Sequence, residues 1–330
     1  MRWLVRGSLL FQGSKVNGMN ARALVIGAGV MGERHAAAIT AAGDSVAVVV
    51  DADVSRAEAL ASHAQVFHTL EEAVQRPELF DLAVVATPSS LHLQQSLQLV
   101  NAGIPVLVEK PHRIPGQSPD TLRRALDNTG GVLFAGMSTR HWPGFENLHR
   151  AISDGDLGEI LSYRDFLGFR LFPHNLPPWY FDSSASGGGV LVTNGVHAFD
   201  RLKTFLGDLT VEDVMVDKRF TKHNVDTYAL TRGHIGSARV SIELSWSPFA
   251  VQNTGVSVIG TRGSALVRMD GSWVVNTNAT SLEGNAIDLD TVPFARQWKA
   301  FCEGKPGFGF EDVEPTIELI QKIYDGVGDE

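Results

Sequence analysis

The sequence predicts an α/β protein in two parts: a doubly wound parallel sheet, then a C-terminal α+β domain with an open, mostly antiparallel sheet. Two observations predict this. Up to about residue 135, short apolar segments alternate with helix-like segments, which is typical of parallel strands joined by helices. From about Arg140 onward, longer and more aromatic apolar segments follow one another directly, which indicates antiparallel or mixed pairing.

Length and composition describe an ordinary globular protein. The chain has 330 residues, enough for two domains, and 44% of them are hydrophobic and 20% charged. The net charge of −9 argues against nucleic acid as the main partner, because such binding depends on basic patches. No apolar stretch approaches the ~20 residues that cross a bilayer, and the single cysteine, Cys302, excludes an intrachain disulfide. We therefore expect a cytoplasmic protein without a nucleic-acid or membrane partner.

A glycine-rich turn organises the first part. The apolar segment Ala23–Ile26 runs into the motif GAGVMG at 27–32, after which a helix is expected to about Ala42. The first glycine permits a tight turn, the second lets the backbone approach a pyrophosphate, and the third lets the helix pack close to the strand. The helix N-terminus then faces the phosphates. This predicts a Rossmann domain that binds a dinucleotide through Gly27, Gly29, Val30, Met31 and Gly32.

The next apolar segment, Ser45–Val50, ends on Asp51. A carboxylate at this point can accept hydrogen bonds from the ribose diol of the adenosine, and it repels the 2′-phosphate of NADP. Arg56 is close enough in sequence to moderate that repulsion. We expect NAD as the cofactor, with NADP as the alternative.

Further elements complete the parallel sheet. A helix over 54–63 is expected to begin after Asp53, which is a suitable N-cap, and Thr69 has capping-box spacing to Glu72. A helix over 91–102 should end at Gly103. The remaining expected strands are 65–68, 81–86, 105–108 and 132–135.

Polar loops follow several of these strands. The glycine motif, Asp51, Thr87-Pro88 and Glu109-Lys110 all come where a predicted strand ends. In a doubly wound sheet, ligands bind at the carboxyl ends of the strands. The residues that we expect to join the glycine motif in binding the cofactor are Asp51, Arg56, Thr87, Pro88, His92, Glu109 and Lys110.

The second part should consist mainly of strands. We expect them over 161–170, 211–219, 226–231, 237–246, 255–259 and 264–269, with a hairpin signal at Asp270-Gly271. Helices are expected over 146–154, 293–302 and 313–324, and another is expected to begin near Leu191 and carry His197.

Taken together, the motifs resemble those of the glucose–fructose oxidoreductase/inositol dehydrogenase (Gfo/Idh/MocA) family. The resemblance covers Ala21 to Tyr324 and rests on GAGVMG with His35, ATPSSLH at 86–92, EKP at 109–111, GMSTR at 136–140, GGGVLVTNGVHAFD at 187–200 and IGTRGSAL at 259–266. It implies an NAD(P)-dependent oxidoreductase that transfers hydride to or from a hydroxyl or carbonyl of a sugar, inositol or related polyol. It also implies a homodimer or homotetramer, with the active site between the domains.

We divide the chain accordingly into three segments. We interpret residues 1–18 as a disordered extension, 19–138 as the dinucleotide-binding domain, and 139–330 as the substrate-binding and oligomerisation domain. Two alternatives to a simple dehydrogenase stay open. One is a glycosidase or epimerase that oxidises its substrate transiently and returns the hydride; the other is a non-catalytic dinucleotide sensor.

Two residues are expected to carry the chemistry. Lys110, at a strand end, can donate to a substrate oxygen and stabilise the charge that develops there, although a solvated lysine is the plain alternative. His197 can take a hydroxyl proton because its unperturbed pKa lies near neutrality, with a core histidine bonded to a backbone carbonyl as the alternative. The family resemblance favours the catalytic role for both.

One position departs from the family pattern. Family dehydrogenases usually carry an aspartate four residues before this histidine, where it can orient the imidazole. Here that position is Thr193, followed by Asn194. Either His197 works with less help, or Asp182 or Asp200 substitutes, or the reaction differs from simple alcohol oxidation.

The remaining candidates concern the substrate. The irregular stretch before the GGG turn contains His174, Trp179 and Tyr180, which could stack on a sugar or close a subunit interface. By resemblance, His92 lies near the nicotinamide ribose, with a helix-surface role as the alternative. His35, in the first helix, is expected to pack in the core. No histidine or cysteine spacing suggests a metal site. The expected substrate contacts are Arg140, His174, Trp179, Tyr180, Thr193 and Asn194.

Overall fold

The computed structural model describes residues 20–170, 176–249 and 254–326, and contacts group these residues into two units. The first unit takes in the described residues up to Arg113, together with Gln117–Ser138 and Asp290–Glu314. The second consists of Ile114–Gly116, Thr139–Leu289 and the described residues from Pro315 onward. No helix in these ranges is long and apolar enough to cross a membrane.

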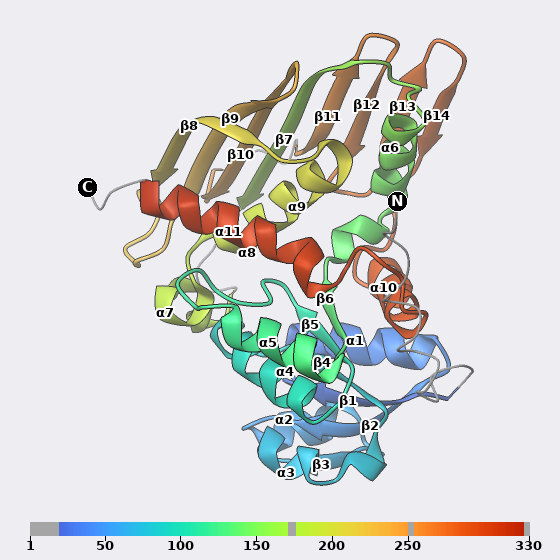
Figure 1. The fold of residues 1–330 in the computed structure, drawn as a ribbon, viewed down its shortest axis with the longest axis vertical. Coiled ribbons are helices and arrows are strands. Elements are labelled where there is room, and N and C mark those ends of the chain that lie inside the picture. Colours follow the sequence, from blue (N-terminus) through green and yellow to red (C-terminus); the bar gives the residue numbers. More distant parts are fainter. Residues whose placement is uncertain (1–19, 171–175, 250–253, 327–330) are drawn as a thin grey trace. The chain divides into compact units, whose positions relative to one another are not determined.

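The first unit contains a parallel sheet of six strands in the order β3-β2-β1-β4-β5-β6 (Figure 1). The strands are β1 (Arg22–Ile26), β2 (Ser45–Val50), β3 (Gln65–Phe67), β4 (Leu82–Val85), β5 (Val106–Glu109) and β6 (Leu133–Gly136). Apart from Arg22, β1 is wholly buried, as are β4, β5 and β6, which explains their nearly continuous apolar sequences. The predicted doubly wound fold is confirmed.

The helices of this unit begin and end largely where local signals predict. They are α1 (Val30–Ala41), α2 (Val54–Leu60), α3 (Leu70–Val74), α4 (His92–Asn101), α5 (Asp120–Thr129) and α10 (Val292–Cys302). Asp53 caps α2, Thr69 and Glu72 form the capping box of α3, and Gly103 after α4 has a φ of +73°. These three signals are confirmed, whereas α5 was not predicted.

Helix α10 packs against α1 although the two are far apart in sequence. The ring of Phe294 meets the ring of His35 edge-on, with centroids 5.2 Å apart. The indole Nε1–H of Trp298, which is 1% exposed, donates to Asp44 Oδ2 at 2.7 Å just after α1. Residues 290–314 thus complete the core of the first unit after the chain has built the second.

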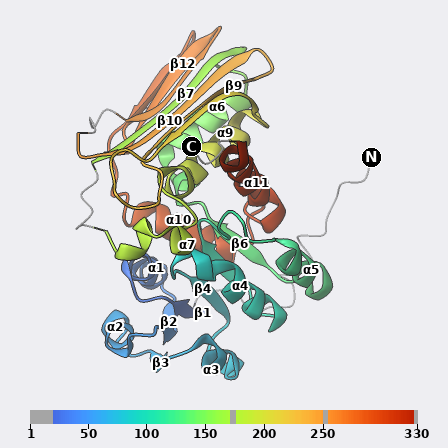
Figure 2. The same ribbon diagram turned by 90° about the vertical axis from the view of Figure 1, so that its left-hand side faces the viewer.

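The second unit contains an eight-stranded sheet in the order β14-β13-β12-β11-β7-β10-β9-β8, labelled in Figure 1 and seen from the side in Figure 2. Its strands are β7 (Ile160–Arg170), β8 (Thr210–Asp217), β9 (Tyr228–Ile235), β10 (Ala238–Ser247), β11 (Gly255–Gly260), β12 (Gly263–Arg268), β13 (Trp273–Thr277) and β14 (Ser281–Gly284). Only β7 and β10 pair in parallel. The open, mostly antiparallel sheet is confirmed, with β13 and β14 as two strands beyond those predicted.

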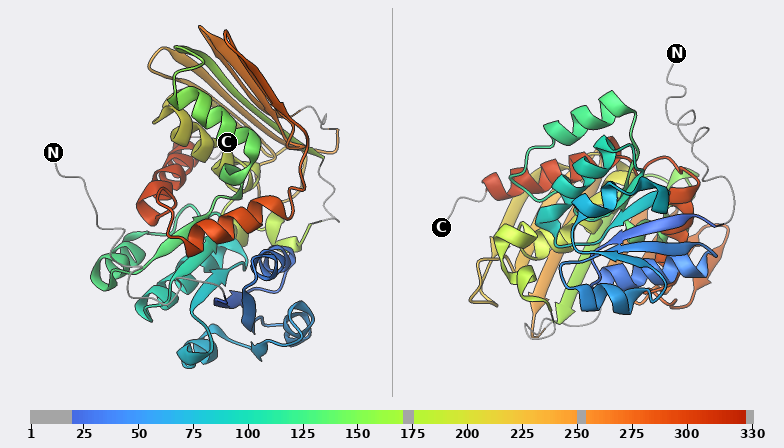
Figure 3. Two further views of the ribbon diagram at one scale, coloured as in Figure 1. Left: turned by 90° about the vertical axis from the view of Figure 1, so that its right-hand side faces the viewer. Right: turned by 90° about the horizontal axis from the view of Figure 1, so that it is seen from below.

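Helices of this unit lie over one face of that sheet (Figure 3). They are α6 (Pro143–Ser153), α8 (Val190–Thr193), α9 (Gly195–Leu206) and the part of α11 (Phe310–Gly326) from Pro315 onward. The unit also contains the short helix α7 (Ser183–Ser186). The prediction of one helix from Leu191 through His197 is wrong, because the helix is interrupted between α8 and α9 at Asn194. The side chain of Asn194 accepts a hydrogen bond from Trp246 Nε1 at 2.7 Å, which stabilises this interruption.

Candidate cofactor and catalytic residues

The glycine turn of the first unit has the shape that a dinucleotide requires. Gly27 has a φ of +96°, and a Cβ there would lie 2.6 Å from the carbonyl oxygen of Ala86. A Cβ on Gly32 would lie 2.0 Å from the carbonyl oxygen of Gly27, so neither position admits another residue. A Cβ on Gly29, in contrast, would meet no atom within 4 Å. The space beside the turn is therefore open where a pyrophosphate would lie.

The start of α1 adds to this fit. Gly29 is its N-cap residue and offers no side-chain acceptor, so the first N–H groups of the helix are available to a phosphate. Val30 is 59% exposed and Met31 is half-buried, which leaves apolar surface beside the turn. A bound dinucleotide would cover that surface.

Asp51 lies directly against this turn. Its Oδ2 accepts the backbone N–H of Ala28 at 2.7 Å, and its Oδ1 accepts that of Asp53 at 2.8 Å. Arg56 reaches Asp51 Oδ1 at 3.5 Å and Asp53 Oδ2 at 3.1 Å, and its side chain is 60% exposed. Each carboxylate oxygen of Asp51 keeps a lone pair for a ribose hydroxyl. The carboxylate is thus held in place and can still accept hydrogen bonds from a ligand.

His92 joins the loops that follow β4 and β5. It is 2% exposed, and its Nδ1 and Nε2 each lie 2.7 Å from a carbonyl oxygen, of Pro111 and Thr87 respectively. Burial lowers the pKa of His92, although both carbonyls act to raise it. The helix-surface alternative is therefore wrong. The hydroxyl of Thr87 donates to Gln95 Oε1 at 2.6 Å, and Pro88 is half-buried.

Glu109 lies buried beneath Lys110 at the end of β5. His35 Nε2 donates to Glu109 Oε1 at 2.7 Å, and the backbone N–H of Lys110 donates to Oε2 at 3.2 Å. Burial acts to raise the pKa of Glu109, but the hydrogen bond and charge of His35, together with Lys110, lower it. His35 is 0% exposed, as the core role predicts. Glu109 is thus a charged support for the loop that carries Lys110.

Lys110 itself is half-buried, and its peptide bond to Pro111 is cis. Burial lowers the pKa of the ammonium, Glu109 opposes this, and Arg34 adds to the lowering. A freely solvated lysine would not be perturbed in this way. A lysine whose pKa is lowered by burial at the carboxyl end of a parallel strand is suited to exchanging hydrogen bonds with a ligand oxygen.

A buried cluster that sequence reasoning missed follows directly. His112 Nε2 donates to Glu314 Oε2 at 2.6 Å, and Arg113 Nε donates to Glu314 Oε1 at 2.9 Å. Burial raises the pKa of Glu314, but the hydrogen bonds from His112 and Arg113 lower it overall. This cluster anchors the segment after the EKP motif to the start of α11. The adjacent pair His112-Arg113 was visible in the sequence, but its partner Glu314, 202 residues from His112 and 201 from Arg113, was not.

In the second unit, His197 lies on the first turn of α9 beside a residue that sequence reasoning did not single out. His197 Nδ1 is 3.4 Å from Thr139 Oγ1, and Arg201 Nη1 is 3.4 Å from the same hydroxyl oxygen. Arg201 Nη2 donates in turn to Asp165 Oδ2 at 2.6 Å. His197 is half-buried and Thr139 is 6% exposed. A hydroxyl thus stands between the histidine and a buried ion pair.

That ion pair is fully enclosed. The side chains of Arg201 and Asp165 are both 0% exposed, and Tyr163 OH donates to Asp165 Oδ2 at 3.4 Å. Burial acts to lower the pKa of Arg201, but the charge of Asp165 raises it; burial raises the pKa of Asp165 against the opposing charge of Arg201. We treat the two as ionised, because a guanidinium keeps its proton in proteins. Burial and Asp165 raise the pKa of Tyr163 well above its ordinary value.

The two acids that could replace the missing aspartate have other partners. Asp200 Oδ2 accepts from Arg140 Nε at 2.7 Å, in a pair whose side chains are 1% and 12% exposed. Asp182 caps α7 by accepting the backbone N–H of Ser184 at 2.9 Å. Arg140, an expected substrate contact, therefore lies in a largely buried ion pair.

The other expected substrate contacts are placed as follows. Thr193 ends α8 and is half-buried, while the Oδ1 of Asn194 is bonded to Trp246. The rings of Trp179 and Tyr180 pack on each other with centroids 4.1 Å apart. His174 lies outside the described residues.

The GGG turn before α8 is held by a carboxylate that sequence reasoning also missed. Asp226 Oδ1 accepts the backbone N–H of Gly189 at 2.7 Å, and its Oδ2 accepts that of Leu191 at 2.8 Å. Tyr324 OH donates to the same carboxylate at 2.6 Å. A Cβ on Gly189 would lie 1.7 Å from the carbonyl oxygen of Asp226, so glycine is required there. This anchor sets the start of α8.

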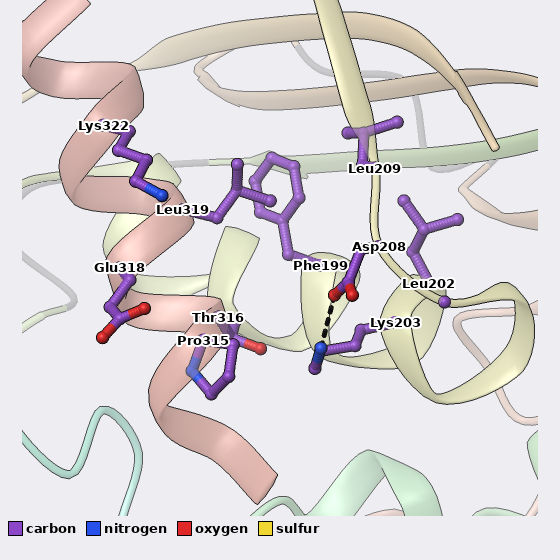
Figure 4. A pocket seen from close by; sticks show the side chains of 11 residues that line it. Phe199, Leu202, Lys203, Asp208, Leu209, Pro315, Thr316, Glu318, Leu319 and Lys322 are labelled. Atoms are coloured by element: carbon purple, nitrogen blue, oxygen red, sulfur yellow. Dashed lines mark hydrogen bonds and ion pairs between the residues drawn. The ribbon is translucent and has the colours of Figure 1, made fainter. Parts of the chain in front are cut away.

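A cavity of about 200 Å³ lies elsewhere in the second unit, between α9 and α11 (Figure 4). Lys203 Nζ pairs with Asp208 Oδ1 at 2.5 Å on its wall. Its lining residues are Phe199, Leu202, Lys203, Gly207, Asp208, Leu209, Pro315, Thr316, Glu318, Leu319 and Lys322. None of these is a residue that the sequence predicts for the site.

Known proteins resemble both halves of the chain. Residues 21–137 match the model of an oxidoreductase family with an NAD-binding Rossmann fold, and residues 145–266 match that of the GFO/IDH/MocA C-terminal domain. scyllo-Inositol 2-dehydrogenase (NADP(+)) of Bacillus subtilis is 29% identical over 170 residues, which are 51% of this chain but only 46% of that protein. 1,5-Anhydro-D-fructose reductase of Ensifer adhaerens is 28% identical over 257 residues, 76% of each chain.

A solved structure shares the whole fold. Levoglucosan dehydrogenase, in complex with NADH and levoglucosan, has a TM-score of 0.81 to this chain. The match covers 93% of this chain and 97% of that one at 18% identity.

Proposed function

Because the chain belongs to the Gfo/Idh/MocA family of NAD(P)-dependent oxidoreductases, we propose that it transfers hydride between the cofactor and a ring hydroxyl or carbonyl of a sugar, inositol or related polyol. Relatives that carry the names of an inositol dehydrogenase and an anhydrofructose reductase support this substrate class. The observation that carries the proposal is the glycine turn, which combines open space at Gly29, free N–H groups on α1 and a fixed Asp51.

In this proposal the first unit binds the dinucleotide. The turn from Gly27 to Gly32 holds the pyrophosphate, and Asp51 accepts the ribose hydroxyls. We favour NAD over NADP, because Asp51 would repel a 2′-phosphate and Arg56 is shared with Asp53. The nicotinamide, when bound, supplies or accepts the hydride.

Lys110 and His197 are the proposed catalytic residues. The Lys110 ammonium donates a hydrogen bond to the substrate oxygen and stabilises the negative charge that develops there during hydride transfer. His197 exchanges the proton of that oxygen. Arg140, Trp179, Tyr180, Thr193 and Asn194 are proposed to shape the substrate site, as is His174. Assembly as a homodimer or homotetramer and a cytoplasmic location stay predictions.

The test is the absorbance of reduced nicotinamide, measured with purified protein and a panel of inositols, aldoses, uronates and keto-sugars, with NAD and NADP in parallel. We expect turnover with one class of polyol, reduced by about 10²–10⁴-fold in His197→Gln, as for loss of a general acid–base. Dinucleotide affinity, measured by calorimetry, should be unchanged in that variant.

Two results would contradict the proposal in different ways. A dinucleotide that binds tightly but is never consumed, while a substrate is cleaved or epimerised, would indicate transient redox chemistry. Dinucleotide binding without any turnover, with the same dinucleotide affinity in Lys110→Met as in the wild type, would indicate a sensor.

A further inference from the structure

Thr139 lies beside the ring of His197, whose usual orienting aspartate is absent at position 193. Its hydroxyl oxygen is 3.4 Å from His197 Nδ1, the ring nitrogen that a carboxylate usually holds in a histidine–carboxylate pair. Resting on the proposed catalytic role of His197, we propose that Thr139 is the positioning residue of this histidine and that it directs the proton of the neutral ring to Nε2.

The hydrogen-bonding capacity of the hydroxyl decides the direction of the bond. A threonine hydroxyl has one O–H donor and two lone pairs, whereas a guanidinium only donates. Arg201 Nη1 therefore occupies a lone pair of Thr139 Oγ1. Within the described residues, the other group at hydrogen-bond distance from this oxygen is His197 Nδ1. Because Thr139 is 6% exposed, an O–H without an acceptor would be costly, so the hydroxyl donates to Nδ1.

Arg201 cannot turn away to release the hydroxyl. Its Nη2 is tied to Asp165 at 2.6 Å, its Cζ lies 4.7 Å from the centroid of the Phe145 ring, and its side chain is 0% exposed. Thr139 is also fixed, because its carbonyl oxygen accepts the backbone N–H of Trp142 at 3.2 Å. The hydroxyl is thus presented to His197 from a rigid support and polarised by a cation on its far side.

The consequence is the reverse of that for a carboxylate. A carboxylate accepts from Nδ1–H and leaves a lone pair on Nε2, which makes the ring a base. With Thr139 donating to Nδ1, the neutral ring instead carries Nε2–H, which is a hydrogen-bond donor. A carbonyl oxygen only accepts hydrogen bonds, so this tautomer is matched to binding the carbonyl form of the substrate. Because a neutral ring that gave up Nε2–H would become an imidazolate, the proton exchanged in the reaction is that of the imidazolium, whose Nδ1–H donates to the second lone pair of the Thr139 hydroxyl. The lack of an aspartate at position 193 is thus accompanied by a different orienting group, the hydroxyl of Thr139.

Nitrogen NMR of the full-length protein, with histidines labelled with ¹⁵N, tests the tautomer without any substrate. The His197 signals are assigned by their loss in His197→Gln. At alkaline pH, where the ring is neutral, we expect Nε2–H to exceed Nδ1–H by about tenfold, the ratio for one net hydrogen bond. Thr139→Val should remove this excess and Thr139→Ser should retain it. A wild-type ring with its proton on Nδ1, or an unchanged ratio in Thr139→Val, would overturn the proposal.

Steady-state kinetics test the positioning role. Thr139→Val should lower kcat by about tenfold or more, within the range for a general acid–base group, with the KM for dinucleotide unchanged, and Thr139→Ser should stay within about threefold of wild type. Thr316→Val is the matched control, because it removes a buried hydroxyl on α11 that has no hydrogen-bond partner in the described part of the chain. Equal kcat in Thr139→Val and wild type would overturn the role. Absence of turnover in the wild type would refute the proposed function, while the NMR ratio would still decide the tautomer.

Discussion

The surroundings of Lys110 and of His197 differ in the side chains that hold their buried carboxylates. Around Lys110, buried carboxylates pair with histidines: Glu109 with His35, and Glu314 with His112 and Arg113. Around His197, buried carboxylates pair with arginines instead: Asp165 with Arg201, and Asp200 with Arg140. His197 itself is left beside a hydroxyl. The acids near this histidine are thus present but already engaged.

This difference has a physical consequence. A guanidinium keeps its charge in proteins, so the carboxylates around His197 are held by permanent cations. Around Lys110, the imidazoles of His35 and His112 take that role, and Arg113 shares it at Glu314. Three substitutions test this difference.

The largest effect should come from Asp165→Asn. This change leaves the Arg201 guanidinium buried without its counter-ion, which typically costs about 3–5 kcal/mol in the free energy of unfolding. Urea unfolding measures the loss, and the double variant Asp165→Leu with Arg201→Met should recover much of it. A single-variant cost below about 1 kcal/mol would show that the pair is not a rigid, buried support for Thr139.

A smaller and pH-dependent effect should come from His92→Gln. The pKa of His92 is lowered in the folded protein from its ordinary value of 6.5, so below pH 6.5 the unfolded chain binds a proton that the folded protein does not. The stability that His92 contributes is therefore complete above pH 6.5 and declines as the pH falls, by up to about 1.4 kcal/mol per pH unit until the folded pKa is reached.

The variant should lack this decline. The free energies of unfolding of the variant and the wild type should therefore converge as the pH is lowered from 8 toward 5. Above pH 6.5 the variant should be less stable by about 1–2 kcal/mol, because one carbonyl loses its donor. Ile26→Val, which removes one buried methyl group and no titratable or hydrogen-bonding group, is the control: it should be destabilised by about 1 kcal/mol at every pH tested. A pH-independent difference for His92→Gln would contradict the assignment.

The two regions also differ in how much the sequence could predict. Asp51, Thr87 and Lys110 follow predictable strands of a parallel sheet, so topology alone indicated that they lie along one sheet edge. Capping at Asp53 and Thr69 was predictable because those hydrogen bonds span three residues or fewer. The sequence also carried a signal for the buried arginine, because Asp200-Arg201 lies directly between the apolar residues Phe199 and Leu202.

What could not be predicted depends on partners far apart in the chain. Thr139 and His197 are separated by 58 residues, and Asp165 and Arg201 by 36. Glu314 reaches the segment after Lys110 from about 200 residues away. No periodicity encodes such pairs. The break at Asn194 likewise depends on Trp246 of β10, so the helical pattern through His197 gave no sign of it.

The smallest effect should come from Arg56→Ala, which sharpens the contrast between buried and exposed ion pairs. Arg56 lies 3.5 Å from Asp51 Oδ1 with its side chain 60% exposed, so solvent screens the pair and stability should hardly change. The substitution should instead act on cofactor choice, because it removes a cation that offsets repulsion between Asp51 and a 2′-phosphate. We expect kcat/KM with NADP to fall by about threefold while that with NAD stays constant, a change that corresponds to the strength of an exposed pair.

Arg76→Ala removes a comparable exposed pair with Glu78, away from the glycine turn, and should leave both values unchanged. An equal fall with both cofactors would mean that Arg56 supports the turn as a whole, and a rise with NADP would mean that Asp51 does not face the ribose.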